Sequence, residues 1–205
     1  HEYPIYTDIH DCKMAADVII DFASAKAVDK LLDYVEDTHI PVVVCTTGLS
    51  EQQKERLEEV SQKASVLVSA NMSLGINVLF KVLNSISGLL SDAGFDIEIV
   101  EKHHNQKLDA PSGTALALAD VINKSMNEKY EYIYDRSDRR KKRADNEIGI
   151  SAIRGGTIVG DHEVIYAGED EEIVIKHTAH SRNVFAKGAL EAAKFLANTS
   201  KGMYS

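Results

Sequence analysis

The stretch DVIIDFASAKAVDKLLDYVEDTHIPVVVCTTG, residues 17–48, decides the fold class because it reads as a strand, a helix and a second strand. Asp17–Phe22 is a short apolar run typical of a buried strand, and Ser24 can cap a helix that continues to about Asp37. Pro41–Cys45 is a second apolar run. Two buried strands joined by a helix predict a parallel βαβ unit.

The same alternation continues beyond this unit. Ser50 and Gln53 have the spacing of a capping box, which predicts a helix through Lys63. Ser65–Ser69 is a third strand-like run. Strands that alternate with helices at this spacing predict a doubly wound sheet in which neighbouring strands are parallel.

The organisation changes after residue 71, where residues 73–90 form one long helix with an apolar face. The later elements that the sequence predicts are the strand Phe95–Val100, a helix over 115–127, the strands Ile148–Arg154, His162–Ala167 and Glu172–Thr178, and a helix over 183–196. We therefore predict an α/β protein with two domains. We expect residues 1–71 to form a βαβ domain with a parallel sheet, and residues 72–182 to form an α+β domain.

Composition narrows the classes of function. The 205 residues carry a formal net charge of −9, which argues against general affinity for nucleic acid or acidic lipid. No apolar run approaches the ~20 residues that span a bilayer, and no secretory signal precedes the first strand. Cys12 and Cys45 lack the spacing of a metal site and indicate reduced thiols. We expect a cytoplasmic protein that binds neither nucleic acid nor membrane.

The stretch EKHHNQKLDAPSGTA, residues 101–115, is the most informative about function, and it lies between a predicted strand and a predicted helix. Histidine titrates near neutrality and suits general acid work, and Lys107 can offer a cation or a proton. Ser112 can cap the helix, so that the N–H groups at its start and the Thr114 hydroxyl can bind a carboxylate. The combination predicts a site that holds and protonates an anion.

Each of these residues also has a plainer interpretation. In most proteins His103 and His104 would be hydrogen-bonded surface histidines, Lys107 a solvated charge, and the Pro-Ser-Gly-Thr turn an ordinary helix cap. Asp109 would orient the turn or Lys107. Their presence together in one turn is what favours a functional site.

The sequence resembles the dihydrodipicolinate reductase family over about residues 17–205, most strongly in the signature 101–115. Further segments that look like family segments, in order and at family-like spacing, are DVIIDF, VVVCTTG, SANMSLGIN, SAIRGGTIVGDHEV and SRNVFAKGAL. The resemblance implies a homotetrameric reductase that uses NADPH or NADH. Residues 1–71 would form part of a Rossmann-like cofactor domain, to which the helix 183–198 can return. Residues 72–182 would form a substrate-binding and tetramerisation domain with a mixed sheet. Its substrate would be a small cyclic dicarboxylate, 4-hydroxy-tetrahydrodipicolinate, which it reduces to tetrahydrodipicolinate in lysine and diaminopimelate biosynthesis.

The resemblance also implies roles for the residues that match the family's motifs. His103 would be the proton donor and acceptor, and Lys107 a second proton donor. His104, Gly113 and Thr114 would bind the substrate. The residues that would lie along the cofactor are Cys45, Thr46, Thr47, Ser69, Ala70, Asn71 and Met72. Arg182 is a further candidate contact for an anion, with a solvated arginine as the alternative.

The sequence also departs from the family pattern. No G-x-G-x-x-G motif occurs, and the first glycine is Gly48. That motif cradles the pyrophosphate, and a residue beyond it selects NADH or NADPH. We therefore leave the choice of cofactor open and expect the chain as given to be a truncated form with weak cofactor binding and little activity. In addition, Cys45 and Met72 stand where the family often has glycine and phenylalanine.

Two other functions compete with this interpretation. One is a different two-domain oxidoreductase, such as a homoserine or aspartate dehydrogenase, which is not expected to carry HHNQKLDAPSGT. The other is a non-catalytic dicarboxylate-binding or assembly module. The missing glycine motif favours such a module, whereas His103, His104 and Lys107 argue against it.

Nucleic-acid binding and metal binding have weaker support. The basic run Arg139–Arg143 is flanked by acidic residues in a net-acidic chain and is typical of a solvated loop. The remaining histidines lack the accompanying cysteine or carboxylate pattern of a metal site, namely His162, His177 and His180. We predict no metal.

Overall fold

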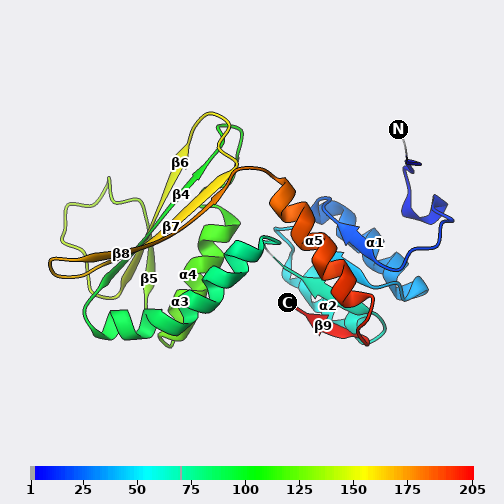
Figure 1. Cartoon of the computed structure of the whole chain (residues 1–205), viewed down its shortest axis with the longest axis horizontal. Coiled ribbons are helices and arrows are strands. Elements are labelled where there is room, and N and C mark those ends of the chain that lie inside the picture. Colours follow the sequence, from blue (N-terminus) through cyan, green and yellow to red (C-terminus); the bar gives the residue numbers. More distant parts are fainter. Residues whose placement is uncertain (1–2, 70) are drawn as a thin grey trace. The chain divides into compact units, whose positions relative to one another are not determined.

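The computed structural model describes residues 3–69 and 71–205, which form two compact units (Figure 1). The first unit comprises His1–Met72 and Phe185–Ser205, and the second comprises Ser73–Val184. Most of the last helix and the whole C-terminal strand therefore belong with the N-terminal part of the chain. Each unit is built around its own sheet.

The first unit has a four-stranded sheet in the order β1-β2-β3-β9, in which all neighbours are parallel. Its strands are β1 (Ile19–Asp21), β2 (Val42–Val44), β3 (Ser65–Val68) and β9 (Gly202–Tyr204). All three valines of β2 are buried, as expected of a strand with helices on both faces. The predicted parallel arrangement is confirmed for β1 to β3. Strand β9 was not predicted, because Gly-Met-Tyr has no apolar run.

Helices cover both faces of this sheet. They are α1 (Ala25–Thr38) and α2 (Glu51–Ser61), which share a core with Val42 and Val44, and α5 (Asn183–Leu196), which shares the opposite core with Val43. A short 3-10 helix, η1 (Ile9–Asp11), precedes β1. Ser50 and Gln53 form the expected capping box at the start of α2. Ser24 is the N-cap residue of α1, but its side chain makes no capping hydrogen bond.

Helix α5 passes very close to the chain that follows β3. A Cβ atom at residue 188 would lie 1.7 Å from the carbonyl oxygen of Met72, so glycine is required for this approach. Met72 itself is buried with Leu196 in the core beneath α5. The segment after β3 is therefore held against the helix by backbone packing.

The second unit has a five-stranded mixed sheet in the order β5-β6-β4-β7-β8. The strands are β4 (Asp96–His103), β5 (Glu131–Tyr134), β6 (Glu147–Arg154), β7 (Gly160–Ala167) and β8 (Glu172–Ala179). Neighbours β5, β6 and β4 are parallel, whereas β7 and β8 are antiparallel additions. The predicted mixed sheet is confirmed. Strand β5 was missed, because it lies within the polar segment 128–147.

Helices α3 (Leu74–Asp92) and α4 (Gly113–Ser125) cover one face of this sheet (Figure 1). The core between them is formed by Leu83 of α3, by Ala115, Leu118 and Ile122 of α4, and by Ile97, Ile99, Ile148, Ile150, Val164 and Tyr166 of the strands. Burial alternates along β4, with Ile97 and Ile99 followed by Glu101 and His103 in the same inward series. The strand therefore continues three residues beyond its predicted end at Val100 and carries polar side chains into the end of the core.

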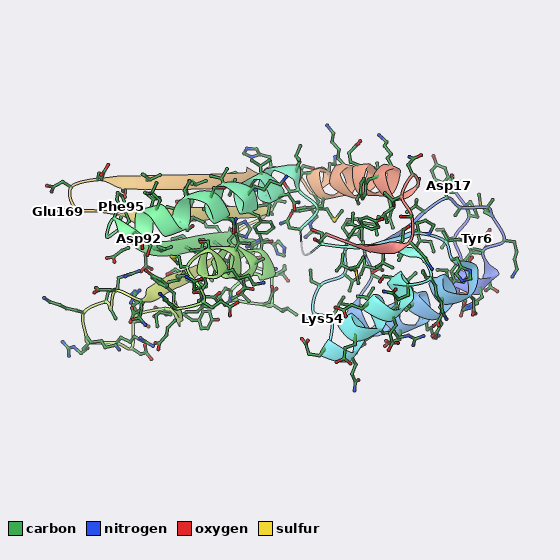
Figure 2. All side chains as sticks on the ribbon, turned by 90° about the horizontal axis from the view of Figure 1, so that it is seen from below. Tyr6, Asp17, Lys54, Asp92, Phe95 and Glu169 are labelled. Atoms are coloured by element: carbon green, nitrogen blue, oxygen red, sulfur yellow. The ribbon has the colours of Figure 1, made fainter. Side chains whose placement is uncertain are left out.

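The opposite end of β4 is closed by apolar packing. Figure 2 labels Asp92 and Phe95 at the turn from α3 into β4, and Glu169 in the turn between β7 and β8. A Cβ at Gly168 would lie 2.8 Å from the Phe95 ring, so this turn packs tightly against the aromatic side chain. The buried polar side chains of β4, Glu101 and His103, lie at its other, carboxyl end.

Helix α3 is, among the described residues, the one helix long and apolar enough to cross a bilayer by length and composition alone. The helix is not a continuous apolar run, because Asn77, Lys81 and Asn84 interrupt it. The helix contributes Leu83 to the core, together with Leu79 and Phe80, which pack against that core. Core helices of folded domains pass the same test of length and composition.

The basic run in the polar loop is not simply solvated. Arg143 pairs with Asp96 at 2.6 Å and with Glu98 at 3.2 Å. Arg136, just before the run, pairs with Glu98 at 2.7 Å and with Glu147 at 2.6 Å. The expectation of a solvated loop is therefore wrong for Arg143, which is bound to the sheet.

Candidate active site

The inward series of β4 ends in two polar side chains that contact each other. Glu101 is fully buried and His103 is 9% exposed. Glu101 Oε2 lies 2.6 Å from His103 Nδ1. An ionised carboxylate can only accept a hydrogen bond, so Nδ1 is the donor. The second ring nitrogen, Nε2, remains as the atom that can exchange a proton with a ligand.

Arg154 holds the same carboxylate with both of its terminal nitrogens. It lies opposite His103 in the register between β4 and β6. Its Nη1 donates to Glu101 Oε2 and its Nη2 to Oε1, each at 2.7 Å. Such a bidentate pair fixes the plane of the carboxylate. The backbone N–H of Ser112 completes the set by donating to Oε1 at 2.9 Å.

These donors decide the charge of Glu101. Burial alone would raise the pKa of its carboxyl group, but hydrogen bonds from His103, Arg154 and the Ser112 backbone outweigh burial and lower the pKa to about 2. Glu101 is therefore an anion near neutral pH. It cannot itself supply a proton to a substrate.

Ser112 links the start of α4 to a second buried histidine. Its Oγ caps the helix by accepting from the Ala115 N–H at 3.2 Å, and lies 3.0 Å from His162 Nε2. Burial, with the neighbouring His103, lowers the pKa of His162 to about 4, so His162 is neutral at neutral pH. The two imidazole rings meet edge to face with centroids 5.1 Å apart. His162 is thus an uncharged ring that packs against the His103 imidazole.

The start of α4 has the properties of an anion site. Gly113 and Thr114 are its first two residues, directly after the capping Ser112. The first N–H groups of a helix have no intrahelical carbonyl partner and carry the positive end of the helix dipole. Because Ser112 also hydrogen-bonds Glu101, this helix start is tied to the carboxylate that holds His103. Glu101 therefore connects the predicted proton donor, His103, with the predicted anion site at the start of α4 through hydrogen bonds to both.

Lys107 lies in the loop between β4 and α4. Its backbone N–H donates to the His104 carbonyl at 3.2 Å, and its Nζ pairs with Asp109 at 2.9 Å. The Asp109 carbonyl in turn accepts from Arg154 Nη2 at 2.7 Å. Burial raises the pKa of Asp109, but the hydrogen bond from Lys107 prevails and the pKa is lowered. The lysine charge is therefore held by Asp109 in this structure.

His104 and Arg182 also come together. Arg182 Nη2 lies 3.4 Å from His104 Nε2, and both side chains belong to the second unit. The contact is exposed, so both groups are accessible to a ligand. The arginine that the sequence offered only as a candidate anion contact thus lies beside a residue of the signature.

In the first unit, the residues expected along a cofactor lie where strands end. The Cys45 N–H, directly after β2, donates to the Asp21 carbonyl at 2.9 Å. Thr46 Oγ1 donates to Asp21 Oδ2 at 2.6 Å in a buried contact, and Thr47 is exposed. The carboxyl ends of parallel strands are where dinucleotides bind in doubly wound sheets. The arrangement of this loop is compatible with that use.

The loop after β3 closes on itself, because Ser69 Oγ donates to the Asn71 carbonyl at 2.9 Å. The Cys45 and Met72 side chains pack in an apolar cluster, and burial, with nearby Asp21, raises the pKa of the Cys45 thiol to about 12. A ligand at these two positions would therefore meet backbone atoms. Ala70 lies outside the described residues.

Sequence reasoning missed the residues that organise His103. Glu101 stands within the signature, and its polar side chain at an inward position of an otherwise apolar alternation was the available signal. Arg154 is 53 residues away from Glu101, and only the strand register pairs them. His162 was considered only as a metal ligand. Within residues 3–69 and 71–205, no cluster of three histidine, cysteine, aspartate or glutamate side chains could hold a metal ion.

Comparison with known proteins decides the family. The family model described as dihydrodipicolinate reductase, C-terminus, matches residues 75–205, and the model described as dihydrodipicolinate reductase, N-terminus, matches residues 1–72. The chain belongs to the dihydrodipicolinate reductase family. The resemblance seen in the signature therefore extends through both units.

Curated relatives of this reductase family are similar along the whole chain. The 4-hydroxy-tetrahydrodipicolinate reductase of Caldanaerobacter subterraneus subsp. tengcongensis is 52% identical over 204 residues, which are 100% of this chain and 80% of the relative. The enzyme of the same name from Staphylococcus carnosus is 50% identical over 205 residues, with 100% of this chain and 82% of the relative covered. The chain thus spans about four-fifths of the length of these two reductases.

A solved structure shares the reductase fold. The dipicolinate-bound dihydrodipicolinate reductase from Paenisporosarcina sp. TG-14 superposes with a TM-score of 0.69 at 22% identity, covering 91% of this chain and 71% of that chain. A probable dehydrogenase from Thermotoga maritima gives a TM-score of 0.59 at 12% identity, covering 94% of this chain and 73% of that chain. At these identities the likeness concerns the fold alone. It confirms a Rossmann-like unit combined with a second, mixed-sheet unit.

Proposed function

We propose that this chain reduces 4-hydroxy-tetrahydrodipicolinate to tetrahydrodipicolinate with NADPH or NADH, in lysine and diaminopimelate biosynthesis. Its relatives at 50% identity and above carry the name of this reductase. The observation that carries the proposal within the structure is the placement of His103, a buried histidine with one ring nitrogen held by Glu101, beside the start of α4. This arrangement combines a proton donor with a carboxylate site.

The substrate is a cyclic dicarboxylate, so two anionic groups need partners. One carboxylate would bind at the start of α4 through Gly113 and Thr114. The exposed pair of His104 and Arg182 would meet the substrate's other polar groups. Lys107 would exchange its partner Asp109 for the substrate and serve as a second proton donor. These local cations and N–H groups allow a chain with a net charge of −9 to bind an anion.

The chemistry asked of the protein is proton transfer. Loss of the substrate hydroxyl together with a hydrogen of the neighbouring ring carbon, as water, gives a conjugated ring; the reduced nicotinamide, when bound, would supply the hydride. His103 donates the matching proton from Nε2, and the neutral His162 beside it adds no competing charge. General acid catalysis of this kind contributes roughly 10²–10⁴-fold in rate.

The first unit would hold the cofactor, and the second would bind the substrate and form the homotetramer, in the cytoplasm. The cofactor would lie along Cys45–Thr47 and Ser69–Met72, at the carboxyl ends of β2 and β3. Exposed Ile173 and Val174 on the outermost strand β8 support contact with another subunit. We place the domain division at residues 1–71 and 72–182, with helix 183–198 in the first domain.

A non-catalytic dicarboxylate-binding module is not favoured, since the similar relatives are named as reductases. The direct test is an assay of the full-length protein with 4-hydroxy-tetrahydrodipicolinate and either reduced cofactor, followed by the loss of reduced-nicotinamide absorbance. Turnover of this substrate but not of homoserine or aspartate supports the proposal. Dipicolinate binding without any turnover would instead establish the binding module.

The role of His103 has a separate test. His103→Gln should lower kcat by about 10²-fold or more, whereas His180→Gln, at an exposed histidine of the same unit, should not. Near-normal turnover of His103→Gln would assign the proton to another residue.

A further inference from the structure

We propose that Glu101 is a positioning residue for His103: clamped by Arg154 and by the Ser112 N–H, it holds the Nδ1–H of His103, so that the other ring nitrogen, Nε2, takes up a proton from solvent and delivers it to the substrate. The inference rests on the proposed reductase function and adds a residue pair to it. Glu101 acts through His103 and not on the substrate, since it is fully buried.

The two carboxylate oxygens of Glu101 accept hydrogen bonds from different groups. Oε2 accepts from His103 Nδ1 at 2.6 Å, and Oε1 accepts from the Ser112 N–H at 2.9 Å. Arg154 donates to both oxygens, so the carboxylate cannot rotate without breaking a bidentate pair. One anion thereby fixes the histidine relative to the helix start that would bind the substrate carboxylate.

The surroundings of the second ring nitrogen of His103, Nε2, leave it free to meet a ligand. Nε2 lies 3.2 Å from the position that a Cβ at residue 160 would occupy, so glycine leaves space beside it. Its neighbouring histidine, His162, directs its own Nε2 to Ser112 instead. Within residues 3–69 and 71–205, no side chain hydrogen-bonds to His103 Nε2, so this atom is available for the proton transfer.

The same sheet provides a matched control. Glu147, 2% exposed at the start of β6, is also a buried carboxylate paired with arginine, at 2.6 Å from Arg136. Its carboxylate pairs with Arg136 and Arg139, and with no histidine of the part of the chain that the structure describes. Glu147→Gln therefore reports the cost of neutralising a buried Glu–Arg pair in this unit, without any change at His103.

The first experiment is a double-mutant cycle in the full-length enzyme. Glu101→Gln should lower kcat by about 10²-fold, while Glu147→Gln should change it by less than about twofold. In the His103→Gln background, Glu101→Gln should cost less than about twofold more, because its effect passes through the histidine. The Kd for dipicolinate should change little, because glutamine keeps an oxygen that can accept from the Ser112 N–H.

An equal loss in both backgrounds would overturn the proposal, since it would mean that Glu101 only supports the fold. A loss confined to substrate binding would overturn it as well. If His103→Gln itself has no effect, the assignment of the proton donor fails, and this outcome is distinct from failure of the positioning role.

The second experiment needs no turnover. Imidazole ¹⁵N chemical shifts of the full-length protein, assigned by the signal lost in His103→Gln, report which nitrogen carries the proton. The wild-type protein should show the Nδ1–H form, which Glu147→Gln should retain and Glu101→Gln should lose. A neutral tautomer with its proton on Nε2 and none on Nδ1 in the wild type would overturn the proposal, even if Glu101→Gln failed to fold.

Discussion

The two ends of the second sheet carry the same kind of ion pair and use it differently. At the carboxyl end of β4, Glu101 is held by Arg154; at the start of β6, Glu147 is held by Arg136. Both carboxylates are buried, and hydrogen bonds lower the pKa of both: chiefly those from His103 and Arg154 for Glu101, and the one from Arg136 for Glu147. Only Glu101 also contacts a histidine and a helix start.

The difference shows that a buried carboxylate–arginine pair is not in itself a sign of catalysis. The Glu147 end is redundant, because Arg139 approaches the same carboxylate at 3.7 Å and Arg143 supports Glu98 nearby. The Glu101 end has a single arginine, and its other donors are His103 and Ser112. Redundancy suits a structural role, whereas a single clamp shared with a reactive histidine suits positioning.

The largest expected difference between the two ends concerns stability. Arg154→Met should lower the free energy of unfolding by about 3–5 kcal/mol, because it leaves a buried carboxylate without its cation. Arg136→Met should cost about 1 kcal/mol, since Glu147 and Glu98 keep other arginines. Urea denaturation of the full-length protein, followed by circular dichroism, measures both. Equal losses would show that the two ends are equivalent.

The next effect is a pH dependence at the Glu101 end. The pKa of His162 is about 4 in the folded protein, against an ordinary value of 6.5. Between these values the unfolded chain binds a proton that the folded chain does not, so the free energy of unfolding falls as pH drops from 6.5 to 4. The shift corresponds to roughly 3 kcal/mol over this window.

The measurement is a series of urea midpoints between pH 7 and 4, compared with His162→Phe, which cannot titrate. The variant should have the flatter profile, whatever its stability at pH 7. His180→Gln, at an exposed position, serves as the control and should keep the wild-type slope. An unchanged slope in His162→Phe would place the pH sensitivity elsewhere.

Much of this architecture could be predicted from sequence because it rests on local patterns. The valine run of β2 and the capping box of α2 each specify their own structure within a few residues. Strand β5 escaped prediction because its strand-forming Tyr-Ile-Tyr lies within the polar segment 128–147, and β9 because Gly-Met-Tyr is too short to show a strand pattern. The pairing of both strands is set by their neighbours. Local pattern therefore gives the elements, and long-range pairing completes the sheets.

The site, like the fold, has one part that could be predicted from local sequence and another part that depends on long-range strand pairing. The signature placed His103, Lys107 and the helix start in one turn, and the structure shows the geometry of each. The clamp on His103 was not predictable, because Arg154 reaches Glu101 through the register of β6 on β4. A polar residue in an inward position can be seen in a sequence, but its distant partner cannot. The assigned roles of the site residues stay predictions until the variants are measured.

The smallest expected effects come from two glycines, one at each end. A Cβ at Gly160 would lie 3.2 Å from His103 Nε2, so Gly160→Ala should crowd the proton-exchanging atom and lower kcat by about tenfold with little change in stability. A Cβ at Gly149 would lie 1.7 Å from Glu98 Oε2, so Gly149→Ala should displace that carboxylate from Arg136 and Arg143. Loss of these two ion pairs should lower the free energy of unfolding by about 1–2 kcal/mol and leave kcat unchanged. Steady-state kinetics gives kcat and urea denaturation gives the free energy of unfolding of both variants. We expect Gly160→Ala to change mainly kcat and Gly149→Ala to change mainly stability. If both lower kcat alike, the Glu147 end also takes part in catalysis.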